Sequence, residues 1–217
     1  MAKVDSELTA APVAAPPAAA PKVANWREQL PVLTRPGLTL REPVAADVVA
    51  LFTALPADAP EQVLVDPPPA SVSGYETFIE RVQAGRRAGQ LACWTIVPDD
   101  SDVPVGIIGV RAMDPQASMV EGFAVVAQEF RGTPLFQTAG RMVLGCLFNQ
   151  MRVHRAEFRI DVRNGRANGA LRKLGATQEG LLRRARRVNG EALDQVLWAI
   201  VSTDWTETRP TRTASVH

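Results

Sequence analysis

The fold of this chain is decided by the stretch Glu121–Gly180, which reads EGFAVVAQEF (121–130), RGTPLFQTAG (131–140) and, further on, HRAEFRIDVRNGRANGALRKLGATQEG (154–180). These words predict a strand, a turn, an amphipathic helix, a second strand and a capped second helix. At the turn 131–133 a strand passes into a helix, so unpaired backbone N–H groups meet the positive end of a helix dipole. Such a junction can bind a phosphate-bearing ligand.

Several short words in this stretch carry a resemblance to a known family. They are Glu121–Val126 (EGFAVV), Arg131–Phe136 (RGTPLF), Asn164–Ala167 (NGRA), Lys173–Ala176 (KLGA) and Glu179–Arg183 (EGLLR). Their order and spacing resemble the coenzyme-A-binding half of the GNAT N-acetyltransferases, most of all the RimJ/RimL branch. In that branch the corresponding words are E-I-G-Y-W-L, R-G-x-G-x-G/A/N, N-x-x-S, x-L-G-F/A and E-G-x-L-R. A looser match covers most of Leu38–Trp205.

The remaining periodicities predict the other elements of the fold. Strands are expected at 38–42, 91–97, 105–113, 119–127, 155–162, 181–188 and 193–201, with a hairpin turn at Asn189-Gly190. Helices are expected from Pro43, after a capping box at Ser73–Glu76, at 137–151, and from the cap Asn164 to the stop Gly175. The resulting order, βααβββαβαββ, predicts an α/β fold with a mixed sheet and helices on both faces. The GNAT-like acyl-CoA N-acyltransferase fold has this order.

Composition divides the chain into one domain and two tails. Residues 1–24 are rich in alanine and proline and are expected to form an extended tail, residues 25–205 one GNAT-like domain, and residues 206–217 a loose C-terminal tail. The proline-rich segment Pro56–Pro69 is either a lid on the substrate side or a plain connector. A single domain is the expected organisation for a chain of 217 residues.

Charge and cysteine content restrict the class of function. The net charge of +1 gives no reason to expect nucleic acid or an anionic membrane as a partner, and no apolar run is long enough for a transmembrane helix. The basic run Arg183–Arg187 is either a charged strand edge or a recruitment site for an acidic partner. Cys93 and Cys146 are expected to be buried free thiols, as in the reducing cytoplasm, and no metal-ligand cluster is present in the sequence.

The resemblance implies acetyl-CoA, or another acyl-CoA, as cosubstrate. Its pyrophosphate would lie on the backbone N–H groups of the turn and helix start, which comprise Arg131, Gly132, Thr133, Pro134, Leu135, Phe136 and Gln137. Pro134 and Phe136 depart from the family, which has small residues there. Proline removes one N–H group and phenylalanine adds bulk, so the turn either still binds the cofactor or has been remodelled. Pro134 is also well suited to the first position of a helix.

By the same resemblance, Ala124, Val125 and Val126 would pair with the pantetheine amides, and a backbone N–H of Val125 or Val126 would stabilise the oxyanion. Their side chains alone indicate only a strand in the core. Asn164 would contact the pantetheine arm, although it is equally an ordinary helix N-cap. Asn168 is a further candidate for the cofactor site.

Glu121 is the candidate general base, because it matches the acidic residue of the family's strand. A carboxylate within an apolar strand is expected to be desolvated, which would raise its pKa toward the working range. The alternatives are a solvent-facing carboxylate or the partner of an arginine. No general acid is evident: the only tyrosine, Tyr75, is expected in the core, and Ala167 replaces the family's serine. A thiolate leaving group needs little help at neutral pH.

Two functions follow from these residues. The first is an N-acyltransferase that moves an acetyl or acyl group directly to an amine, which is either a peptide N-terminus or a small molecule. The second is a catalytically weak protein of the same fold that acts as a CoA sensor or scaffold. Family members often form dimers, and the apolar segment Leu193–Val201 would supply either such a contact or plain core.

Overall fold

The computed structural model describes residues 25–55, 69–188 and 190–205. Its strands are β1 (Leu33–Arg35), β2 (Leu38–Arg41), β3 (Leu91–Pro98), β4 (Gly106–Ala112), β5 (Met119–Val126), β6 (Arg155–Asp161), β7 (Thr177–Val188) and β8 (Glu191–Val201). Its helices are α1 (Val48–Ala54), α2 (Val72–Arg87), α3 (Pro134–Gly145) and α4 (Gly165–Leu174), with short 3-10 turns at Ala45–Asp47 and Gln128–Phe130. None of these described helices is long and apolar enough to cross a membrane.

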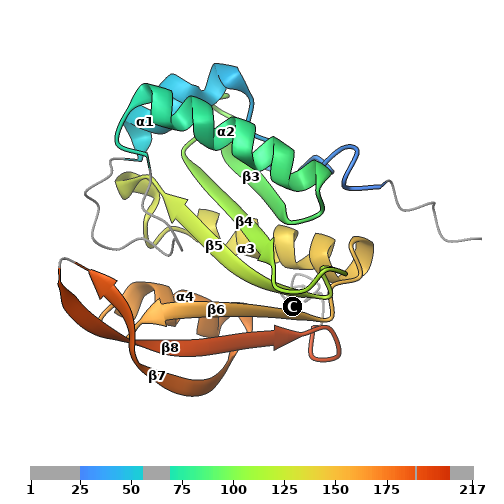
Figure 1. Cartoon of the computed structure of the whole chain (residues 1–217). Coiled ribbons are helices and arrows are strands. Elements are labelled where there is room, and N and C mark those ends of the chain that lie inside the picture. The colour runs from blue at the N-terminus through green and yellow to red at the C-terminus, as the bar shows by residue number, and fades with distance from the viewer. Residues whose placement is uncertain (1–24, 56–68, 189, 206–217) are drawn as a thin grey trace, which may run out of the picture.

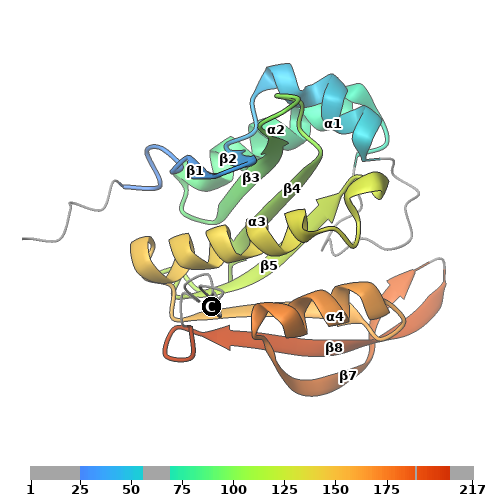
Figure 2. The same ribbon diagram turned by 180° about the vertical axis from the view of Figure 1, so that it is seen from behind.

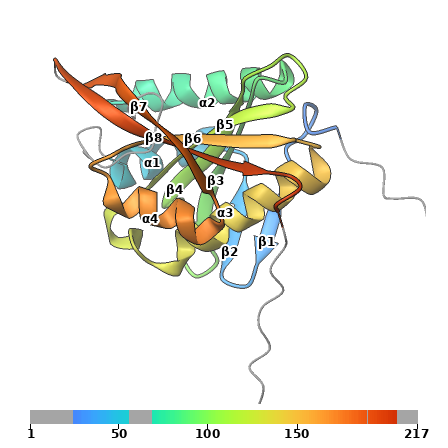
Figure 3. The same ribbon diagram turned by 90° about the horizontal axis from the view of Figure 1, so that it is seen from below.

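The strands form a single mixed sheet in the order β1-β2-β3-β4-β5-β6-β8-β7. Neighbouring strands are antiparallel except for β5 and β6, which are parallel. Helices α1 and α2 cover one face of the sheet and α3 and α4 the other (Figures 1, 2 and 3). The prediction of a mixed sheet with helices on both faces is therefore confirmed.

The parallel pair β5–β6 holds together only at its start. Paired residues are Met119 with Arg155, Val120 with Ala156 and Glu121 with Glu157, after which the two strands separate (Figure 1). Gly122 permits this close start, because a Cβ atom at that position would collide with the ring of Phe158 on β6. The edge of β5 beyond Glu121 therefore has no strand partner toward β6.

One continuous core lies on both sides of the sheet. The largest fully buried side chains include Trp94 on β3, Tyr75 on α2 and Leu147 after α3. Trp94 and Tyr75 keep their polar ends satisfied: the indole Nε1 donates to the Pro31 carbonyl and the Tyr75 hydroxyl to the Leu55 carbonyl. Such bonds allow large amphipathic rings to be buried without an unpaired donor.

Several predicted boundaries differ from the structure. The helix expected from Pro43 begins later, as a 3-10 turn at Ala45–Asp47 followed by α1, because the carboxylate of Asp47 accepts from the Val44 N–H and pairs with Arg41. Phe52 on this helix is 38% exposed, whereas Val48 and Leu51 are buried. Residues 33–35 form an additional short strand that the sequence analysis missed.

Two predicted caps have different outcomes. The N-cap of α2 is Ser71, not Ser73: the extended backbone of Ser71 lets its hydroxyl accept from the Gly74 N–H. Asn164 caps α4 as predicted, and Gly175 ends that helix with a φ of 89°. A π-helical turn, Cys146–Gln150, continues α3 to the predicted end of that helix. The predicted tails, most of the segment Pro56–Pro69 and Asn189 lie outside the described residues.

Candidate active site

A cavity of about 330 Å³ opens where β5 and β6 separate, on the face of the sheet that carries α3 and α4. Its walls come from the end of β5, the turn before α3, the first turn of α3 and one side of α4. The lining residues are Ala124, Val125, Val126, Phe130, Arg131, Gly132, Thr133, Phe136, Gln137, Asn164, Gly165, Arg166, Ala167, Gly169, Ala170 and Lys173. Most residues predicted to hold the cofactor are therefore brought together. The exceptions are Pro134, Leu135 and Asn168, which do not line the cavity.

The β5 wall offers backbone rather than side chains. Ala124, Val125 and Val126 are buried, and they pair with β4 along one edge of the strand. Their other edge faces the gap, where β6 no longer provides a ladder. Buried backbone amides are nearly always satisfied in native proteins. A ligand that carries amide groups can complete this edge as an additional strand would.

The turn before α3 and the start of that helix use three of the six N–H groups of residues 131–137 within the turn itself. The N–H of Arg131 donates to the Gln128 carbonyl, that of Thr133 to the Phe130 carbonyl, and that of Leu135 to the Thr133 hydroxyl. Pro134, the first residue of α3, has none. As a result, the turn presents fewer backbone donors to an anion than the resemblance implied, and the loss is larger than Pro134 alone would cause.

Gln137 has an acceptor atom that is buried and unpaired among the described residues. Its amide Nε2 donates to the Ala170 carbonyl at 2.9 Å, which links α3 to α4 and fixes the orientation of the amide. The remaining oxygen, Oε1, has no hydrogen-bond partner in the described part of the chain. Gln137 thus lines the cavity and ties α3 to α4, while its Oε1 is itself shielded from the cavity.

The two asparagines of α4 have different positions. Asn164 lines the cavity and also caps α4, since its Oδ1 accepts from the Ala167 N–H at 3.0 Å. Asn168 does not line the cavity. Its amide donates to the carbonyls of Asp161 and Asn164, and its Oδ1 accepts from the indole Nε1 of Trp198 at 2.8 Å. Asn168 therefore joins α4 to the sheet, a role that the sequence analysis did not foresee.

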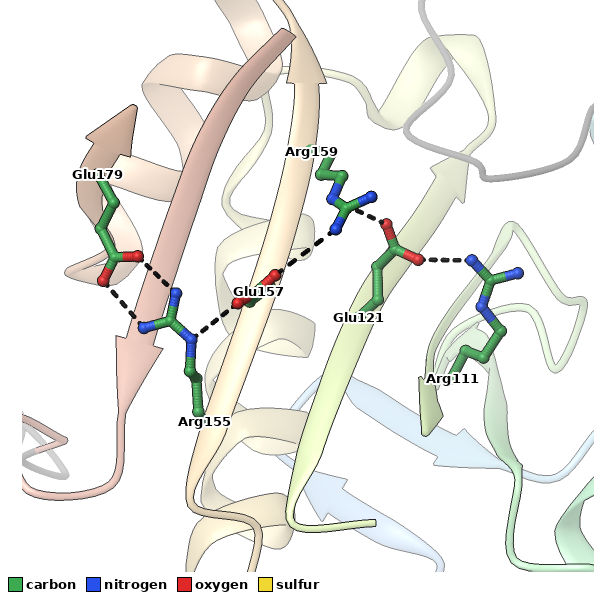
Figure 4. A network of polar contacts seen from close by, with 6 residues as sticks. All are labelled: Arg111, Glu121, Arg155, Glu157, Arg159 and Glu179. Atoms are coloured by element: carbon green, nitrogen blue, oxygen red, sulfur yellow. Dashed lines mark hydrogen bonds and ion pairs between the residues drawn. The ribbon is translucent and has the colours of Figure 1, made fainter. Parts of the chain in front are cut away.

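Glu121 lies on the other face of the sheet, at the last paired position before the strands part. It is buried, yet its carboxylate receives a hydrogen bond from Arg111 at 2.6 Å and lies 3.7 Å from the Nε of Arg159 (Figure 4). The structure thus realises the alternative in which Glu121 is the partner of an arginine. Its role as general base remains a prediction.

The groups expected in the core lie there. Burial raises the pKa of Tyr75 to about 12 and that of the Cys146 thiol to about 12. Burial, with the nearby charge of Glu42, also raises the pKa of Cys93. Both cysteines are free and buried. Thiols held in the protonated form are poor nucleophiles.

Comparison with known proteins assigns the family. Residues 37–177 match the family model described as acetyltransferase (GNAT) domain, so the chain belongs to the GNAT acetyltransferase family. This confirms the predicted class of enzyme, the acyl-CoA-dependent N-acetyltransferases. No curated protein sequence matches the chain.

Solved structures share the fold at low sequence identity. RimJ of Mycobacterium smegmatis, in complex with CoA-disulfide, is 22% identical with a TM-score of 0.72. The match covers 83% of this chain and 90% of the RimJ chain. RimL, the ribosomal L7/L12 α-N-protein acetyltransferase solved in complex with coenzyme A, is 17% identical with a TM-score of 0.72, over 79% and 98%. The ribosomal-protein-S5-alanine acetyltransferase of Vibrio fischeri is 16% identical with a TM-score of 0.70, over 81% and 98%. The predicted resemblance to the RimJ/RimL branch agrees with these neighbours.

Proposed function

We propose that the chain binds acetyl-CoA, or another acyl-CoA, in the cavity between β5, α3 and α4 and transfers the acyl group directly to an amine in a ternary complex. The observation that carries this proposal is the unpaired edge of β5 beside the cavity. A pantetheine arm has two amide groups, and an extended amide chain can pair with a strand edge.

The residues present fit the pantetheine arm better than the pyrophosphate. Toward the arm, the edge of β5 at Ala124–Val126 offers partners for amide groups. Toward the phosphates, the turn retains few backbone donors. The cationic side chains of Arg166 and Lys173 line the same cavity and would supply the missing positive charge.

When bound, the cosubstrate supplies an activated acyl thioester. In this arrangement the cavity orients that group toward the gap between β5 and β6. Glu121, at the closed end of the gap on the opposite face, would accept the proton that the amine loses. The buried, protonated thiols of Cys93 and Cys146 argue for direct transfer rather than an acyl-enzyme.

Binding is tested first, by titrating the purified chain with acetyl-CoA and desulfo-CoA in a calorimeter. Micromolar affinity for both ligands is the expected result. Absence of binding up to millimolar ligand would contradict the proposal and would favour a scaffold that retains only the fold.

The general base is tested with Glu121→Gln, using Glu157→Gln as the matched control because both carboxylates are buried and face each other across the β5–β6 pair. Loss of a general base lowers kcat by about a hundredfold or more. We expect such a loss for Glu121→Gln, with acetyl-CoA affinity changed by less than about threefold, and a far smaller loss for Glu157→Gln. Equal losses in the two variants would remove Glu121 from the mechanism and leave it a structural residue.

A further inference from the structure

Six charged side chains of alternating sign, contributed by four strands, form a row on the face opposite the cavity. From β4 to β7 they are Arg111, Glu121, Arg159, Glu157, Arg155 and Glu179 (Figure 4). Strand register produces this row, since Arg111 pairs with Glu121 across β4–β5 and Glu121 pairs with Glu157 across β5–β6. We call it the charged row.

The charged row is neutral in sum but presents positive charge to solvent at the gap. The side chains of Glu121 and Glu157 are only 9% and 10% exposed, whereas those of Arg111 and Arg159 are 49% and 44% exposed. The carboxylates therefore lie beneath the guanidinium groups. A molecule that approaches this part of the sheet meets the two arginines first.

Both arginines retain hydrogen-bonding capacity. A guanidinium has five N–H donors. In the described part of the chain, Arg111 uses one of them, to Glu121 at 2.6 Å. Arg159 lies 3.7 Å from Glu121 and 3.9 Å from Glu157, distances that make ion pairs without a hydrogen bond. The pair can thus bind a carboxylate while Glu121 and Glu157 hold it in position.

The position of Arg111 and Arg159 relative to the gap connects this pair of arginines to the acceptor. Arg159 is two residues beyond the last β5–β6 pair, so it stands where the strands begin to separate, on the face of Glu121. The acyl-CoA cavity opens on the other face. An amine that reaches the thioester from the side of α1 and α2 would pass Arg111 and Arg159.

We propose that Arg111 and Arg159 select amine acceptors that carry a carboxylate close to the reacting amine. This inference rests on the proposed acyltransferase function and gives its acceptor a chemical class. The carboxylate would come from an acidic side chain near a peptide N-terminus or from a free amino acid. Charge-assisted hydrogen bonds to guanidinium groups would provide the discrimination.

The test compares acceptors that differ only in charge. The peptide amides Ala-Glu-Ala-Gly and Ala-Gln-Ala-Gly form one pair, and free glutamine and glutaminamide, which lacks the α-carboxylate, form the other. Turnover is followed by thiol release, and equilibrium binding of each acceptor to the protein, with and without CoA, is measured by calorimetry. We expect the carboxylate-bearing member of one pair to be preferred about tenfold to a hundredfold in kcat/KM and in affinity. The preferred pair identifies the source of the carboxylate.

Variants assign the preference to the charged row. Arg159→Gln and Arg111→Gln are each expected to reduce the ratio to below about threefold, mainly through KM, whereas Arg159→Lys should restore part of it. Arg87→Gln, which removes an exposed arginine from the last turn of α2, should leave the ratio unchanged. Circular dichroism and thermal unfolding check that each variant is folded.

The outcomes separate this inference from the proposed function. Equal use and equal binding of the charged and neutral acceptors, or a preference that persists in Arg159→Gln, would overturn the inference even if acetyl-CoA binds. If acetyl-CoA does not bind but the arginine-dependent affinity for the acidic acceptor is present, the acyltransferase proposal fails and the carboxylate site stands.

Discussion

On the α3/α4 side of the gap between β5 and β6, the cavity combines a free strand edge with small, aromatic and cationic side chains, whereas on the α1/α2 side the sheet carries the charged row. The first surface suits a ligand recognised by its amide groups and shape. The second suits a ligand recognised by its charge. The point where β5 and β6 separate therefore presents two surfaces of different chemistry, one on each face of the sheet, and each surface suits a different ligand.

The most direct test of this difference between the two faces is to fill the cavity. Ala170 lines it on α4, and Ala170→Trp would place an indole in a volume of about 330 Å³. We expect acetyl-CoA affinity to fall by about a hundredfold or more, since the ligand and the ring cannot share the space. Ala84→Trp on the exposed side of α2 is the control, with unchanged affinity. Calorimetric titration measures both; unchanged binding in Ala170→Trp would place the cofactor elsewhere.

A second prediction distinguishes Asn164, which lines the cavity, from Asn168, which only holds α4 against the sheet. Asn168→Ala would leave the buried indole Nε1 of Trp198 without its acceptor, so we expect a loss of about 2–3 kcal/mol in the free energy of unfolding. Asn164→Ala should cost about 1 kcal/mol, the usual value of a helix cap, together with weaker acetyl-CoA binding. Urea denaturation gives the first quantity and calorimetry the second. A stable Asn168→Ala protein with impaired cofactor binding would reverse the two roles.

The contrast between the two surfaces can be sharpened at the phosphate end of the cavity by restoring the backbone N–H donor that Pro134 lacks. Pro134→Ala returns a backbone N–H to the first turn of α3, and we expect acetyl-CoA to bind about two- to tenfold more tightly. Pro36→Ala, in the exposed turn between β1 and β2, controls for the general effect of losing a proline. If affinity does not rise in Pro134→Ala, this turn does not hold the phosphates and the cationic side chains of α4 carry that role.

The smallest effect concerns the outer end of the charged row. The hydrogen bonds from Arg155 lower the pKa of Glu179 below its ordinary value of 4.5. Because the folded-state pKa is the lower one, this pair stabilises the protein above about pH 4.5 and the contribution is lost as the pH falls through the folded pKa. Wild type should therefore be slightly more stable than Glu179→Gln at pH 7, with the difference shrinking as the pH falls below about 4.5. Thermal unfolding over this range measures it, and a difference independent of pH would contradict the assignment.

The cavity was largely predictable because its parts are local. A strand end, a turn, a helix start and a helix cap each leave a signal within a few residues, so Ala124, Thr133 and Asn164 could be assigned from short words. The turn was harder: its residues were identified, but the use of its N–H groups by Phe130 and Gln128 depends on the loop conformation. The unpaired oxygen of Gln137 has no sequence signal either, since it follows from the contact of Gln137 with Ala170 on another helix.

The sequence by itself determined the order of elements apart from the short strand β1, together with the caps of α4 and the family, because hydrophobic period, turn chemistry and short motifs act over neighbouring residues. Only the tertiary structure decided which charges meet. Arg111, Glu121 and Arg159 lie on three strands, and their meeting depends on strand register, which the chain settles only when the whole sheet forms. The same holds for the bond between Asn168 and Trp198, whose partners are 30 residues apart. Local words could therefore predict which residues line the cavity, while the row of charges on the opposite face came from long-range pairing.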